Sequence, residues 1–105
     1  MERRERVANL IRKLSAEFLI QENNRDALIT VTGANVSPDL RHATVLITVL
    51  PESKENAALG FAKRKRSKVR DILKENMKTK VVPFLDFAID QGEKNRQKID
   101  ELLRN

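Results

Sequence analysis

The chain has 105 residues, of which 40% are hydrophobic and 34% are charged, and its formal net charge at pH 7 is +6. This length predicts one domain with one hydrophobic core. The absence of cysteine excludes a disulfide framework, a thiol nucleophile and a thiolate metal site. No apolar stretch approaches the ~20 residues of a membrane-spanning helix, and the charged start is unlike a signal peptide. We therefore expect a soluble, cytoplasmic protein.

The first half of the chain predicts one helix and two strands. Residues 4–20 carry apolar side chains at the spacing of an amphipathic helix. Residues 28–36 are rich in β-branched side chains and predict a strand, in which Gly33 indicates a bulge. Pro38 favours a β-turn, and residues 43–50 predict a second strand that is apolar almost throughout. Such a strand is typical of the centre of a sheet or of a position covered on both faces.

The second half predicts two helices, a third strand and a last helix. Residues 56–77 have helical periodicity, but continuing their first apolar stripe by one turn would bury the Lys65 ammonium, which is costly. The pattern therefore predicts two helices that meet at residues 65–67. Residues 85–89 alternate with period two and predict a strand, and residues 93–103 predict a short helix. The apolar residues of that helix are Ile99, Leu102 and Leu103.

The predicted order of elements is helix, strand, strand, helix, helix, strand, helix. Three strands and a facing layer of helices make a two-layer α/β (α+β) sandwich. The helix pair between the second and third strands would form a right-handed crossover if those strands are parallel in one sheet. One face of the sheet would then be buried and the other accessible, and the apolar stripes of the helices would hold the fold.

Cationic side chains are concentrated in one run of eight residues at the predicted helix junction. Six of the eight are cationic, which equals the formal net charge of the whole chain. Such a concentration is typical of a protein that binds a phosphate backbone. The alternative is a solvated helix face, which is what most charge runs are. The candidate nucleic-acid-binding residues of the run are Lys63, Arg64, Lys65, Arg66, Ser67, Lys68 and Arg70.

Further cations lie outside the run. Arg3, Arg4, Arg6, Lys78 and Lys80 would widen the cationic patch if they share its face, which the sequence alone does not decide. The N–H groups at the start of a helix would add positive potential at the junction. If about six phosphates are neutralised, log K should fall with log salt concentration at a slope of about −4 to −5.

The chain has four phenylalanines and neither tyrosine nor tryptophan. Phe18, Phe61 and Phe87 lie on apolar stripes or in a strand and are expected in the core. Phe84 is then the only ring expected at the surface, and one ring is no platform for stacking unpaired bases. Recognition is expected to depend on phosphates and on RNA shape.

No group of residues predicts catalysis. The single histidine, His42, lies between a turn and a strand, which favours a surface or structural role. The glycines form no phosphate-cradling loop, and no serine lies in a Gly-x-Ser-x-Gly elbow. Asp86 and Asp90 are expected to cap or solvate the third strand rather than to bind Mg²⁺. We therefore expect no enzyme activity, no metal, no cofactor, no small-molecule substrate and no membrane partner.

Several short segments match, in order, the pattern of one known family. They are Arg3-x-x-Arg6-Val7-x-x-Leu10-Ile11, Thr30-Val31-Thr32, Val36-Ser37-Pro38-Asp39-Leu40-Arg41-x-Ala43-x-Val45, Val69-Arg70-x-x-Leu73, Val82-Pro83-x-Leu85-x-Phe87-x-x-Asp90 and Ile99-x-x-Leu102-Leu103. Through these segments the chain resembles ribosome-binding factor A along nearly its whole length.

The resemblance implies a type II K-homology-like domain over residues 1–105, in agreement with the predicted order of elements. It implies a factor without enzyme activity that binds the small (30S) ribosomal subunit and assists late assembly and 16S rRNA processing. Lys65-Arg66-Ser67 stands where that family has an Ala-x-Gly kink between two helices. The alternatives are a K-homology-type binder of other structured RNA and a protein-interaction module that docks an acidic partner. A monomer is the simplest expectation.

Overall fold

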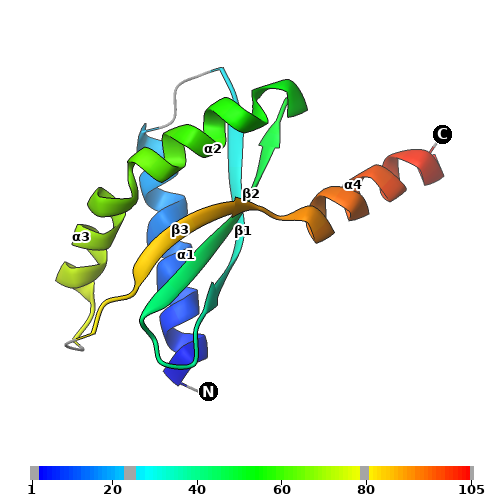
Figure 1. Ribbon diagram of the computed structural model, residues 1–105. Helices are drawn as coiled ribbons and strands as arrows, with labels where there is room; N and C mark the ends of the chain where they lie inside the picture. The colour runs from blue at the N-terminus through cyan, green and yellow to red at the C-terminus, as the bar shows by residue number, and fades with distance from the viewer. Residues whose placement is uncertain (1–2, 23–25, 79–80, 105) are drawn as a thin grey trace.

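A computed structural model describes residues 3–22, 26–78 and 81–104 (Figure 1). The elements, in chain order, are α1 (Arg3–Glu22), β1 (Leu28–Val36), β2 (His42–Leu50), the 3-10 helix η1 (Glu52–Lys54), α2 (Glu55–Arg64), α3 (Arg66–Asn76), β3 (Phe84–Ile89) and α4 (Gln91–Arg104). Apart from the short η1, these are the predicted elements in the predicted order. The mixed α/β fold class is therefore confirmed.

The sheet has the strand order β1-β2-β3, so β2 is the central strand. β1 and β2 are antiparallel, whereas β2 and β3 are parallel and are joined through α2 and α3. The central position of β2 explains its nearly continuous apolar sequence. The register of β1 shifts between Val31 and Gly33, which confirms the predicted bulge and leaves Thr32 outside the regular pairing.

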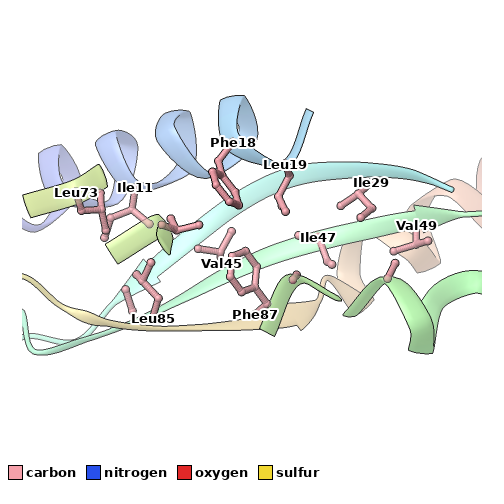
Figure 2. Packing of buried hydrophobic residues seen from close by; sticks show 14 of the residues in the cluster. Ile11, Phe18, Leu19, Ile29, Val45, Ile47, Val49, Leu73, Leu85 and Phe87 are labelled. Atoms are coloured by element: carbon pink, nitrogen blue, oxygen red, sulfur yellow. The ribbon is translucent and has the colours of Figure 1, made fainter. Parts of the chain in front are cut away.

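The hydrophobic core lies between one face of the sheet and the helices α1, α2 and α3 (Figure 2). Alternate residues of the strands face this core, as the period of two requires. Figure 2 shows the side chains of Ile11 and Phe18 pointing from α1 toward Val45 and Phe87 of the sheet. Ile11, Val45 and Phe87 are almost completely buried, so this layer forms the centre of the fold.

The predicted interruption of the central helix lies at Lys65. α2 ends at Arg64 and α3 begins at Arg66, while the backbone of Lys65 has φ −94° and ψ 4°, outside the helical region. Ala62 and Val69, on either side of the break, are both fully buried. Lys65 instead lies with Nζ 5.7 Å from the centroid of the Phe61 ring. The break therefore keeps the ammonium out of the core, as the apolar stripe predicted.

α4 does not contribute to the core. Its apolar residues Ile99, Leu102 and Leu103 are 56%, 76% and 80% exposed. Figure 1 shows α4 directed away from the sheet and the other helices. The expectation that the apolar stripes hold the fold is therefore wrong for α4. Helical periodicity predicts that an apolar face exists, but it does not predict the surface that covers this face.

Polar contacts attach the first turn of α4 to the rest of the molecule. Oδ1 of Asp90 accepts a hydrogen bond from the Glu93 N–H (3.0 Å), and Oδ2 accepts one from the hydroxyl of Thr32 (2.6 Å). Lys94 Nζ lies 2.8 Å from a carboxylate oxygen of Glu52 in η1. Asp90 is thus the N-cap of α4 and connects this helix to the bulge of β1.

Removing the Asp90 carboxylate should destabilise this attachment in a pH-dependent way. The hydrogen bonds from the Glu93 N–H and from Thr32 lower the pKa of Asp90 from its ordinary value of 3.8. Its stabilising effect is therefore complete above that ordinary value and is lost as the pH falls through the lower pKa of the folded state. We expect Asp90→Ala to lower the free energy of unfolding in urea by about 1 kcal/mol near neutral pH.

This loss should shrink in acid, where the wild-type carboxyl becomes protonated. Asp90→Asn is the matched control, because asparagine also caps helices but does not titrate. Its loss of unfolding free energy at neutral pH should be small, and its own stability should lack the pH dependence that ionisation of Asp90 gives the wild type. An Asp90→Ala loss of equal size in acid and at neutral pH would show that the carboxylate is not the stabilising group.

Candidate nucleic-acid interface

Most of the basic run surrounds one open groove, which we call the junction groove. It is formed by the end of α2, the start of α3 and the first residues of β3. The residues that line it are Lys63, Arg64, Arg66, Ser67, Arg70, Phe84 and Leu85. Five of the seven candidates from the run are therefore brought together on one surface.

One carboxylate lies beside these cations. Oδ1 of Asp86 is 3.3 Å from Nη1 of Arg66 and 3.7 Å from Nζ of Lys63. All three side chains are about half exposed, and exposed ion pairs of this kind contribute only about 0–1 kcal/mol. Because one carboxylate faces two cations, the groove keeps a net positive charge. The ion pairs are also weak enough to be exchanged for contacts with phosphate.

Arg64, Lys65 and Lys68 of the run have no carboxylate partner within the described ranges. Arg64 is exposed and lines the junction groove, so its guanidinium is available to a ligand. Lys65 lies over Phe61, and Lys68 is exposed on α3; neither lines the groove. In this part of the chain no side chain caps the start of α3, so its first N–H groups add to the positive potential.

Arg70 differs from the other cations because the backbone holds it in place. Its Nε and Nη2 donate hydrogen bonds to the carbonyl oxygens of Pro83 (3.3 Å) and Val82 (3.0 Å). Its Cζ lies 4.2 Å from the centroid of the Phe84 ring. Phe84 is 60% exposed, which confirms the expectation that it lies at the surface. Arg70 thus supplies a fixed charge and supports an aromatic ring at the edge of the groove.

Three of the candidate cations outside the run lie in a second groove. Arg3, Arg6 and Lys78 line this open groove, between the start of α1 and the end of α3, together with Asn76, Met77, Val7 and Leu10. The two grooves lie at opposite ends of α3, whose 11 residues span about 16 Å. Arg4 lines neither of them, and Lys80 lies outside the described residues. Arg3, Arg6 and Lys78 therefore form a second site rather than a wider junction groove.

The predicted site did not include three residues of β3 at the junction groove: Phe84 and Leu85, which line it, and Asp86, which contacts its cations. The parallel pairing of β3 with β2 places these residues beside the helix junction. The expected exposure of Phe84 was the only sequence signal for its role, and nothing local to Asp86 indicated its partners.

The described residues include no cluster of three or more acidic or histidine side chains that would hold a metal ion. Within the same residues, every helix is too short or too polar to cross a bilayer.

Comparison with known proteins identifies the family of this chain. The sequence profile of the family Ribosome-binding factor A matches residues 3–103. The chain belongs to the ribosome-binding factor A family. Ribosome-binding factor A of Magnetococcus marinus is 32% identical over 105 residues, which cover 96% of this chain and 85% of that protein. The resemblance found in the sequence is therefore confirmed.

Structures of ribosome-binding factor A share the fold. The crystal structure of the protein from Thermus thermophilus has a TM-score of 0.72 at 19% identity, covering 84% of this chain and 97% of that one. A homology model of the Thermus thermophilus protein, fitted into a cryo-EM map of its complex with 30S, has a TM-score of 0.66 at 21% identity. It covers 77% of this chain and 88% of its own. The predicted K-homology-like arrangement is thereby confirmed as the fold.

Proposed function

We propose that this protein is a non-enzymatic, cytoplasmic assembly factor that binds the immature small ribosomal subunit and assists maturation of its 16S rRNA. Membership of the family supports the ribosomal role, as does the Thermus thermophilus relative fitted into a map of its own 30S complex. Residues 1–105 act as a single RNA-binding domain. The observation that carries the proposal is the gathering of the basic run around one groove that keeps a net positive charge.

The junction groove binds the phosphate backbone of the rRNA. Arg64 offers a guanidinium whose forked N–H groups match two phosphate oxygens at once. Lys63 and Arg66 exchange their weak contacts with Asp86 for contacts with phosphate. The N–H groups at the start of α3 add to the attraction without the flexibility of a side chain.

The second groove extends the contact along the RNA. Arg3, Arg6 and Lys78 lie at the end of α3 that is opposite to the helix junction. A backbone that follows α3 therefore meets both sites. Contacts with about six phosphates over the two grooves correspond to a salt slope of about −4 to −5.

Sedimentation of the tagged protein with cell extract tests this function. We expect the protein to travel with free small subunits and not with whole ribosomes. Recovery with neither species would make the proposal wrong. Retention on an acidic protein after nuclease treatment would favour the protein-interaction alternative. Equal competition by unrelated structured RNA would indicate a general RNA binder.

A further inference from the structure

We propose that the junction groove takes an unpaired nucleotide whose base stacks on the ring of Phe84. The inference rests on the proposed function and specifies the chemistry of its RNA: a single-stranded segment, or a base turned out of a helix. It departs from the expectation, drawn from the small number of aromatic residues, that recognition depends on phosphates and RNA shape alone. The surroundings of the Phe84 ring support this inference.

Phe84 is exposed inside a cationic groove rather than on an ordinary surface. A single exposed apolar side chain needs no explanation in itself. This ring, however, shares its groove with Lys63, Arg64, Arg66 and Arg70. Grooves that combine cations with an accessible aromatic face are the sites that unpaired nucleotides occupy, since every base can stack on a ring while its phosphate meets a cation.

The ring is also held in place before any ligand arrives. The guanidinium of Arg70 covers one of its faces, with Cζ 4.2 Å from the ring centroid. Hydrogen bonds to the carbonyl oxygens of Val82 and Pro83 fix this guanidinium in turn. Phe84 remains 60% exposed despite this cover, so much of the residue is accessible to a base. A ring that is already ordered loses little conformational freedom on binding, which increases the affinity that stacking provides.

The ring of His42 lies beside Phe84 and limits the positions open to a base. His42 is the register partner of Phe84 in the parallel pair of β2 and β3. The two ring centroids are 6.2 Å apart and the ring planes differ by 33°. A base inserted between two parallel rings needs about 7 Å, which is two contacts of about 3.5 Å, so the base does not enter between them. It lies on the exposed part of the Phe84 ring, outside the space between the two rings.

This geometry discriminates between kinds of RNA. A base inside a duplex is stacked on both faces, so it cannot reach the ring unless it leaves the stack. Phosphate contacts alone, by contrast, are available from paired and unpaired RNA alike. The side chain of Phe84 should therefore affect the binding of single strands and not the binding of duplexes.

Phe84→Leu is the decisive variant, because it removes the ring and keeps an apolar side chain. We expect its affinity for a single-stranded RNA of about eight nucleotides to fall about five- to hundredfold, the range for one stacked base. Its affinity for a fully paired hairpin of the same charge should stay unchanged. Phe84→Tyr, which keeps the ring, should bind both RNAs like the wild type. Fluorescence anisotropy of labelled RNA measures all these affinities, and thermal unfolding confirms that the variants fold.

Phe84→Trp gives an independent readout of contact. The chain contains no tryptophan, so the indole signal would report on position 84 alone. Single-stranded RNA should quench it and the hairpin should not. Equal affinity of Phe84→Leu and wild type for the single strand, or an unchanged indole signal at saturation, would overturn the stacking. A wild-type protein that binds neither RNA nor small subunits would overturn the proposed function as well, so the two failures are distinguishable.

Discussion

Reversing the charges of Arg64 and Arg66 together, with Arg64→Glu and Arg66→Glu, should weaken binding to purified small ribosomal subunits at least about a hundredfold. Both side chains line the junction groove. Each charge-assisted hydrogen bond that is lost removes about 1.5–3 kcal/mol of binding, before repulsion between the new carboxylates and phosphate is considered. The fold should survive, since both residues are exposed and the pairing of Arg66 with Asp86 contributes at most about 1 kcal/mol. Co-sedimentation and thermal unfolding of the same preparation measure the two effects.

Arg12→Glu with Lys13→Glu is the matched control for this experiment. Both residues are exposed on α1, they line neither groove, and their reversal changes the net charge by the same amount. The control variant should retain most of its binding. Unaltered co-sedimentation of the groove variant would refute the assignment of the site. An equal loss in both variants would mean that total charge, and not the groove, determines binding.

Removing the ring of Phe87 should cause the largest loss of stability. Phe87 is 1% exposed, and its side chain points from β3 into the core between the sheet and the helices (Figure 2). Truncation of a buried phenylalanine to alanine typically lowers the free energy of unfolding by about 3–5 kcal/mol. The free energy of unfolding of such domains is only about 5–15 kcal/mol in total, so Phe87→Ala should leave the protein only marginally folded. Denaturation in urea, with the midpoint and the slope both fitted, measures this loss.

Phe84→Ala is the internal comparison for that prediction. Phe84 lies on the same strand, but its ring is exposed and contacts Arg70 and His42. Its loss should change the free energy of unfolding by no more than about 1 kcal/mol, the size of an exposed cation–π contact. Similar losses in both variants would contradict the placement of the core on the Phe87 side of β3.

The parts of the fold that follow from local patterns could be predicted from the sequence. The period of the apolar residues predicted the helices and strands, and the lack of polar alternation in β2 indicated a strand that is central or covered on both faces; the structure shows it central. The break at Lys65 could be predicted because a buried ammonium is costly in free energy. The bulge near Gly33 could be predicted because glycine inside a strand often marks one.

The parts that depend on distant contacts could not be predicted. Asp86 faces Lys63 and Arg66 across 20 or more positions of sequence, and only the folded crossover brings them together. The same holds for Arg70 and Phe84, whose contact gives the groove its aromatic edge. The exposure of the apolar face of α4 could not be predicted from the sequence either. The helical period of apolar residues is the same whether or not another element covers that face.

The cations outside the basic run show the same limit. Arg3 and Lys78 are far apart in sequence, and their placement in one groove depends on how α1 packs beside the end of α3. Charge counting selected them as candidates for a cationic surface. It did not separate them from the junction groove, because net charge carries no information about position.

The dependence of subunit binding on salt concentration tests the central claim most directly, namely that cations of the junction groove neutralise rRNA phosphates. The wild type should be compared with the double variant Arg64→Gln and Arg66→Gln, which removes charge without adding repulsion. Each phosphate contact contributes about 0.7–0.9 to the slope of log K against log salt, so the slope of the variant should be shallower by about 1.4–1.8. Parallel lines for the two proteins would mean that neither guanidinium meets a phosphate, and would contradict the claim.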